Sequence, residues 1–149
     1  MSKTNTWEND LLNLLFNNIT AAGIGDVSGL IKSSIDGYLY VSLHTANPDV
    51  FGNQTTNETS YSGYTRFGVS RNINGWIISG SNPAQVSNNI IAIYPTCLGG
   101  TSTITHVGIG SALSGAGKLL YYGVLASPLI ISTNITPTFN VGALVITES

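Results

Sequence analysis

The heptapeptide YLYVSLH at residues 38–44 places its aliphatic side chains at every second position. Successive side chains of an extended chain point to opposite faces, so Leu39, Val41 and Leu43 share one face. A period of two over seven residues indicates a β-strand. Similar runs continue toward the C-terminus, separated by polar turns: TRFGVSR (65–71), WIISG (76–80), QVSNNIIAIY (85–94), STITHVGIG (102–110), KLLYYGVL (118–125), PLIIST (128–133) and GALVITE (142–148).

The connections between these runs are typical of antiparallel sheets. Asn74-Gly75, just before WIISG, is a strong hairpin signal, and TCLGGTS and SALSGAGK are loops rich in Gly and Ser. No helical pattern occurs between the runs, which argues against a parallel α/β fold. We predict a mainly β fold, an antiparallel β-sandwich or jelly roll of about eight strands. We expect one domain over residues 1–149, with the sandwich at 38–149.

One helix is predicted, at residues 6–19. Thr6 is the expected N-cap, and Glu8 and Asp10 follow near the first turn, where the helix dipole favours acids. Trp7, Leu11, Leu14, Leu15 and Asn18 fall on one side at helical spacing, and Leu12, Phe16 and Ile19 widen this stripe. The stripe has two possible partners: the helix packs on its own domain, or it is an arm that packs on a neighbouring subunit.

The composition favours contact with other proteins. Only 8% of the residues are charged, against roughly 25% in an average soluble domain, and Asn, Ser, Thr and Gly supply the polarity. The net charge is −2, and the five Lys and Arg residues are scattered along the chain. We therefore expect no nucleic-acid partner and no membrane partner. We also expect no signal peptide and no membrane-spanning segment.

The residues that carry chemistry form no recognisable motif. His44 and His106 lie far apart, and neither belongs to a metal-binding spacing with Asp49 or Glu58. Cys97 is the single cysteine and is expected to be a small buried side chain. No GxSxG nucleophile elbow and no phosphate-binding GxxxxGK[ST] motif occurs. We predict no catalytic residues, no metal and no cofactor, and hence no enzyme.

The segment LHTANPDVFGNQTTNETSYSGYTR at residues 43–66 is predicted to be a long, ordered loop. Pro48, Asp49, Gly52 and Asn53 supply two consecutive turn signals. Tyrosine and arginine then follow, and both are enriched in interface hot spots. We expect the loop to close against the sandwich or against a partner. We also hypothesise that Arg66 pairs with Glu58 and fixes the loop.

Several segments carry a family resemblance: WENDLLNLLF (7–16), YVSLHTANP (40–48), TNETSYSGYTR (56–66), ITHVGIG (104–110), GAGKLLYYGVL (115–125) and ITPTFNVGALVITES (135–149). Together they resemble a family of small virion proteins of tailed bacteriophages, some labelled tail fiber proteins and others similar to capsid cement or decoration proteins. One segment, AAGIGDVSGLIKSSIDG (21–37), is longer than the usual link between the helix and the first strand of that family.

The resemblance implies a structural part of a virion. The short chain, the absence of a fiber-like repeat and the low charge favour a cement protein on the outer capsid surface. Its partners would be the major capsid protein and copies of itself, as a homodimer or homotrimer. The alternative is a tail or tail-fiber component in host adsorption that binds a glycan or receptor. The residues expected to make contact are Trp7, Leu11, Leu15, His44, Asn47, Glu58, Tyr61, Tyr64 and Arg66.

Overall fold

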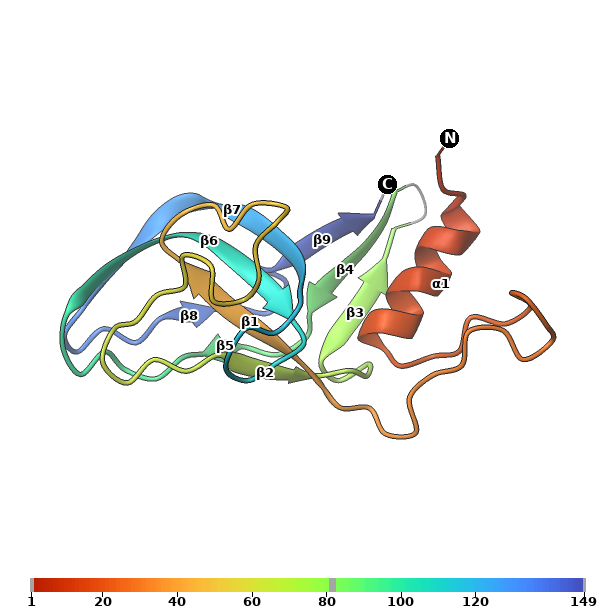
Figure 1. Ribbon diagram of the computed structural model, residues 1–149, viewed down its shortest axis with the longest axis horizontal. Helices are drawn as coiled ribbons and strands as arrows, with labels where there is room; N and C mark the ends of the chain where they lie inside the picture. Colours follow the sequence, from red (N-terminus) through yellow and green to blue (C-terminus); the bar gives the residue numbers. More distant parts are fainter. Residues whose placement is uncertain (1, 81–82, 149) are drawn as a thin grey trace. The chain divides into compact units, whose positions relative to one another are not determined.

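The computed structural model describes residues 2–80 and 83–148 of the 149-residue chain (Figure 1). Within these residues the chain is mainly β, with several antiparallel sheets and one N-terminal helix, as predicted. This content is consistent with a β-sandwich of about eight to nine strands. The elements are α1 (Asn5–Phe16), β1 (Tyr38–His44), β2 (Phe67–Ser70), β3 (Trp76–Ser79), β4 (Ala84–Asn88), β5 (Ala92–Ile93), β6 (Thr101–Gly110), β7 (Leu119–Ser132), β8 (Thr138–Phe139) and β9 (Val145–Glu148).

The chain divides into two compact units, and it enters each of them more than once. Unit 1 comprises Met1–Tyr38, Val69–Ile91 and Asn140–Ser149. Unit 2 comprises Leu39–Gly68 and Ala92–Phe139. Because both units are assembled from separated segments, their strands are joined by contacts between residues far apart in the sequence.

Helix α1 packs on β3 and β4 of its own unit. Its N-cap lies two residues before the predicted one, because the Thr4 hydroxyl accepts a hydrogen bond from the Trp7 N–H at 3.4 Å and so caps the helix instead of Thr6. It ends at Phe16 rather than residue 19, since Asn18 adopts a positive φ of 52°. None of the described residues lies in a helix with the length and apolar character that a membrane span requires.

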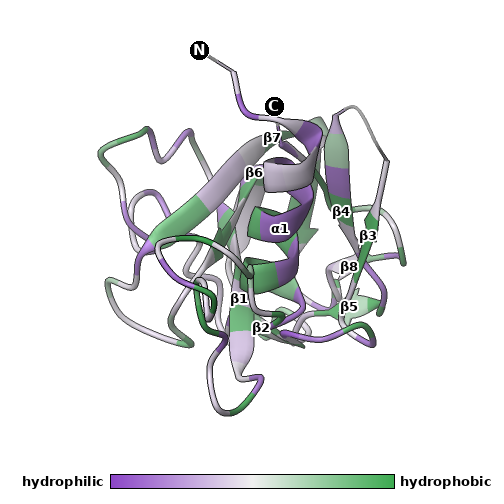
Figure 2. Cartoon of the chain, turned by 90° about the vertical axis from the view of Figure 1, so that its right-hand side faces the viewer, coloured by the Kyte–Doolittle hydropathy of each residue, from purple (hydrophilic) through white to green (hydrophobic). Residues whose placement is uncertain are grey.

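The buried side of α1 contains Leu12 and Phe16, which were predicted to widen the apolar stripe, rather than the residues at the centre of that stripe. Glu8, Leu12 and Phe16 are buried, whereas Trp7, Leu11 and Leu15 are only half-buried. Figure 2 shows hydrophobic and hydrophilic residues in turn along the helix, and its buried and half-buried apolar residues belong to more than one side of it. Tertiary contacts select the buried side. The Glu8 carboxylate accepts a hydrogen bond from the Ala84 N–H at 3.2 Å, and the Phe16 ring meets the Trp76 ring edge to face at 4.9 Å.

The sheet of unit 1 has the strand order β3-β4-β9, all antiparallel. Its buried side carries Trp76, Ala84 and Val86. Asn88, at the end of β4, is also buried, and its amide is satisfied. The Nδ2 group donates to the Ile90 and Asn140 carbonyls at 2.8 Å each, and Oδ1 accepts from the Leu144 N–H at 2.9 Å. These bonds fix where the chain turns into β9.

The long link between α1 and β1 forms an arm, defined here as residues 19–36. It includes the β-bridge between Ala21 and Leu30. Polar contacts fasten its base. Arg71 donates to the Leu14 and Leu15 carbonyls at 2.8 and 2.7 Å and to the Asp36 carbonyl at 3.3 Å. Hydrogen bonds from Asn72 and Asn18 lower the pKa of Asp36.

Unit 2 contains the antiparallel strands β1, β6 and β7, in a sheet of order β2-β1-β6-β7, and the short pair β5-β8. One face of β1 carries Leu39, Val41 and Leu43, all buried as the alternation predicts. The Tyr94 hydroxyl lies in this core and donates to the Val41 carbonyl at 3.2 Å. The opposite face carries Ser42 and His44, and these are fully buried as well. Another segment must therefore cover the second face.

Candidate functional site

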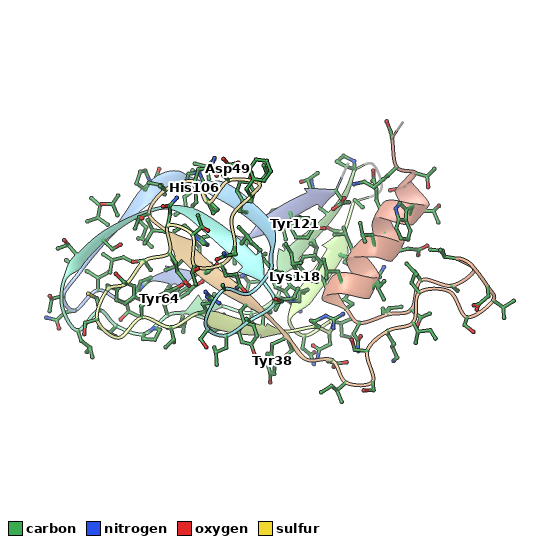
Figure 3. All side chains as sticks on the ribbon, in the orientation of Figure 1. Tyr38, Asp49, Tyr64, His106, Lys118 and Tyr121 are labelled. Atoms are coloured by element: carbon green, nitrogen blue, oxygen red, sulfur yellow. The ribbon has the colours of Figure 1, made fainter. Side chains whose placement is uncertain are left out.

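The second face of β1 is covered by the predicted loop, residues 45–66, which joins β1 to β2. Two of its turns place Asp49 and Asn57 at positive φ, 64° and 54°. The Asn47 side-chain oxygen accepts a hydrogen bond from the Asp49 N–H at 2.9 Å, which closes the first turn. Figure 3 shows Asp49 at one end of the loop, well apart from Tyr64. The loop is ordered, as the turn signals predicted.

The hypothesised pair between Glu58 and Arg66 is present. Arg66 Nε donates to Glu58 Oε1 and Arg66 Nη2 donates to Glu58 Oε2, both at 2.7 Å. Arg66 is 5% exposed. Its guanidinium also donates to the Ala112 and Gly115 carbonyls at 2.9 and 2.8 Å, so it joins the 45–66 loop to the β6–β7 connection. The hydrogen bonds with Glu58 raise the pKa of Arg66, so the guanidinium stays charged.

Two tyrosines complete this interior network. The Tyr64 hydroxyl donates to Glu58 Oε1 at 2.9 Å and accepts from the Leu43 N–H at 3.0 Å. The Tyr61 hydroxyl donates to the Pro95 carbonyl at 2.9 Å. Their rings meet at 5.3 Å, edge to face. Burial raises the pKa of Tyr61 to about 12 and raises that of Tyr64 as well, so both remain protonated hydrogen-bond donors.

His44 is held from both sides of its ring. Nδ1 lies 2.8 Å from the Thr56 carbonyl, which can only accept, so Nδ1 carries the proton. Nε2 therefore accepts from the Ser42 hydroxyl, also at 2.8 Å. Burial lowers the pKa of His44 and favours its neutral form. Because Ser42 and His44 are both fully buried, this pair supports the loop and cannot reach a substrate in this structure.

Gln54 is the main supporting residue that the sequence analysis missed. It is fully buried. Its Nε2 donates to the Tyr40 carbonyl at 3.3 Å, and its Oε1 accepts from the Ala112 N–H at 2.9 Å. A side-chain carbon at Gly110 or Gly117 would lie 2.2 or 2.3 Å from Gln54 atoms. Gly110 and Gly117 therefore make room for this glutamine.

The outer turn of the loop presents apolar side chains to solvent. Phe51 is 96% exposed and Val50 is 72% exposed. The turn is tight, since the Gly52 N–H donates to the Asp49 carbonyl at 3.1 Å and a Cβ on Gly52 would lie 2.0 Å from the Pro48 carbonyl oxygen. Neither Val50 nor Phe51 was among the residues expected to make contact. The local sequence pattern predicts the turn but does not predict that these two apolar side chains project into solvent.

The structure separates the predicted contact residues into three groups. His44, Glu58, Tyr61, Tyr64 and Arg66 come together inside unit 2, where they hold the 45–66 loop. Asn47 is exposed beside the outer turn, and its carbonyl accepts from the Asn57 side chain at 2.9 Å. Trp7, Leu11 and Leu15 lie on α1 in unit 1. The buried members of the first group contact their own chain, which leaves partner contact to exposed residues.

This arrangement can present a rigid surface. Three donor groups satisfy the Glu58 carboxylate, and the histidine and serine are sealed under the loop. Within residues 2–80 and 83–148, no group of three or more His, Cys, Asp and Glu side chains could hold a metal ion. Cys97 is buried, as expected, and its thiol donates to the Gly99 carbonyl at 3.3 Å.

Comparison with known proteins gives one family. The model of the podophage GP4 fiber I protein gp80 family matches residues 2–147. No curated protein matches the chain. The match agrees with the predicted resemblance to virion proteins of tailed phages, and it makes the chain a structural protein of the virion. The chain belongs to the podophage GP4 fiber I protein gp80 family.

Proposed function

We propose that this chain is a component of a phage tail fiber and takes part in adsorption to the host. The observation that carries the proposal is the match of residues 2–147 to a family described as a fiber protein. The chain contains no heptad or other repeat of a fiber shaft. It therefore suits a compact, terminal or connecting part of a fiber rather than an elongated stalk.

The geometry supports a role for the 45–66 loop in this contact. The Glu58–Arg66 pair and the Gln54 amide order the loop before any partner arrives. A loop that is already ordered loses less conformational entropy on binding. Phe51 then stands at the outer turn as an exposed aromatic side chain, the kind that anchors interface hot spots. We propose that this turn touches the host surface.

Competition for adsorption tests this proposal. Purified chain, added in excess to host cells, should slow adsorption of the phage by occupying its receptor. A Phe51→Ser variant should compete at least tenfold less well while remaining as stable as the wild type. Leu98→Ser is the matched control, since Leu98 is also largely exposed in unit 2, and it should compete normally. Absence of competition by the wild type would contradict an adsorption role.

A capsid cement protein is the second candidate. The low charge, 8% of residues, and the polar surface rich in Asn, Ser and Thr favour permanent contact with a protein lattice. The major capsid protein would then be the partner, and many weak contacts would combine through avidity. Binding of the purified chain to shells assembled from coat protein alone, saturating at a fixed number of copies, would favour this candidate. We propose no catalytic role in either case.

A further inference from the structure

The arm, residues 19–36, exposes more apolar surface than a surface loop needs. Val27 is 94% exposed, Ile31 is 72% exposed and Ile35 is 75% exposed. Scattered apolar side chains are ordinary on protein surfaces, but a segment that gathers many of them marks a site of interaction. The full set of exposed large apolar side chains in the arm is Ile19, Ile24, Val27, Leu30, Ile31 and Ile35.

The base of the arm is built to hold one conformation. The Asn18 side chain donates to the Ser33 carbonyl at 3.0 Å and accepts from the Ser33 N–H at 2.8 Å. Arg71 and Asn72 hold the Asp36 end, and the Ala21–Leu30 bridge closes the middle. In Figure 1 the arm runs out from the end of α1 before the chain returns to β1. A rigid base lowers the entropy lost when the outer part binds.

A groove lies beside the arm in the same unit. It is a shallow, open depression of about 380 Å³ between the first turns of α1 and Ile24 of the arm itself. Trp7 and Ile24 are the large apolar residues of its lining, and Asp10 is the charged residue. The complete lining is Thr4, Thr6, Trp7, Asp10 and Ile24.

Charge complementarity relates this groove to the arm. The arm carries Asp26, Lys32 and Asp36. Asp26 is engaged by its own turn, because its Oδ1 accepts from the Ser28 and Gly29 N–H groups at 2.7 and 3.1 Å, and Asp36 belongs to the base. Lys32 is exposed, although its charge also acts on Asp36 of its own chain, and it is the cation that the arm offers to a partner. A lysine among aliphatic side chains is complementary to a tryptophan-lined groove with one carboxylate.

We propose that the arm of one copy of this chain docks into the α1 groove of a second copy. A buried aliphatic side chain contributes about 60–120 Å² of apolar surface. Ile24 lines the groove of its own copy, so the other five exposed side chains present about 200–400 Å² in one arm. One arm and its groove together then bury about 400–800 Å², less than the roughly 1,200 Å² of a stable interface. Two reciprocal contacts bury about 800–1,600 Å², a range that includes this size, so we propose a closed assembly in which every arm is docked. This docking between copies applies equally to a fiber component and to a cement protein.

Light scattering after size exclusion tests the proposal on the full chain. The wild type should be a closed oligomer at micromolar concentration. The double variant Val27→Asp/Ile31→Asp should dissociate at a concentration at least 100-fold higher than the wild type does. Ile77→Asp/Val145→Asp is the matched control, because these residues are exposed on the sheet of the same unit. It should retain the wild-type assembly, and circular dichroism should show that both variants are folded.

A charge exchange tests the groove itself. Asp10→Lys and Lys32→Asp should each weaken assembly about tenfold, and the two changes combined should restore it, since the opposite charges then meet again. A wild-type chain that stays monomeric at every concentration would overturn the proposal. Equal loss of assembly in the matched control would do the same. Failure of the combined variant to recover would exclude the groove as the place where the arm docks.

Discussion

Replacement of Arg66 by alanine is the perturbation that bears most directly on how the 45–66 loop is held. Arg66 makes four hydrogen bonds from one buried guanidinium, two of them to Glu58. Removing one partner of a buried ion pair costs about 3–5 kcal/mol, because the other charge is left without compensation. In the variant, the Glu58 carboxylate still accepts a hydrogen bond from the Tyr64 hydroxyl and is slightly exposed to solvent. We therefore expect a loss near the lower end, about 3 kcal/mol.

Urea denaturation followed by circular dichroism measures this loss. A decrease of about 3 kcal/mol in a chain of this size corresponds to a melting temperature lower by about 6–12 °C. Arg66→Lys should be intermediate, because an ammonium group cannot make the two-pronged bond to the carboxylate. Lys118→Ala, an exposed cation on the neighbouring connection, is the matched control and should change stability by less than about 0.5 kcal/mol. A loss below about 1 kcal/mol for Arg66→Ala would refute the reasoning, since an ordinary hydrogen bond accounts for that much.

Three further substitutions test the interior. Burial lowers the pKa of His44 below 6.5 in the folded chain, so the unfolded chain takes up the proton first as the pH falls. The free energy of unfolding should therefore decrease as the pH falls below about 6.5. In His44→Gln the free energy of unfolding should depend less on pH in this range. An unchanged pH dependence in the variant would show that other groups cause it. Gly108→Ala places a Cβ 2.7 Å from His44 Nε2 and should lower the free energy of unfolding, measured in thermal melts, by about 1–3 kcal/mol. Gly123→Ala is the control, since its Cβ would meet nothing within 4 Å, and it should leave stability unchanged. Equal effects of the two variants would contradict the close packing of Gly108 against His44. Asn88→Ala removes three hydrogen bonds to backbone groups, although the Asn140 carbonyl keeps the bond from the Ala143 N–H. The variant should lower stability by about 2 kcal/mol in urea, and a neutral result would show that water replaces the amide.

The local pattern predicted the strands but not what covers them. Leu39, Val41 and Leu43 alternate and are buried, as a period of two requires. Ser42 and His44 belong to the face that the pattern assigns to solvent, yet they are fully buried. The 45–66 loop covers them, and folding back of a loop depends on distant partners such as the Ala112 and Gly115 carbonyls. A strand pattern contains no information on those partners.

For helix α1 as well, the sequence pattern predicted the element but not which of its sides is buried. Its existence followed from the spacing of apolar residues, but α1 buries Leu12 and Phe16 from the edge of the predicted stripe rather than Trp7, Leu11 and Leu15 from its centre. The helix is apolar on more than one side, and the Ala84 N–H selects the side that carries Glu8. A carboxylate would not be placed in a core from sequence alone, since its burial depends on that donor.

In the 45–66 loop, the features that depend on residues close together in the sequence could be predicted. Turn residues marked its ends, and Glu58 and Arg66 were the opposite charges within it, so their pairing could be hypothesised. Gln54 was missed because its partners lie near residues 110–117, far along the chain. The strands also depend on long-range pairing. The runs at 118–125 and 128–133 are one strand, β7, whose register with β6 shifts between Ile104 and His106.

Localisation on the intact particle tests the central claim most directly. Cryo-electron microscopy of the virion, at a resolution that shows strands, would identify the density of this chain by α1 and its two units. We predict that the density lies at the tail, in a fiber, with the outer turn that carries Phe51 facing away from the particle. Density repeated over the shell with icosahedral symmetry would contradict the fiber assignment and would make the chain a capsid cement protein.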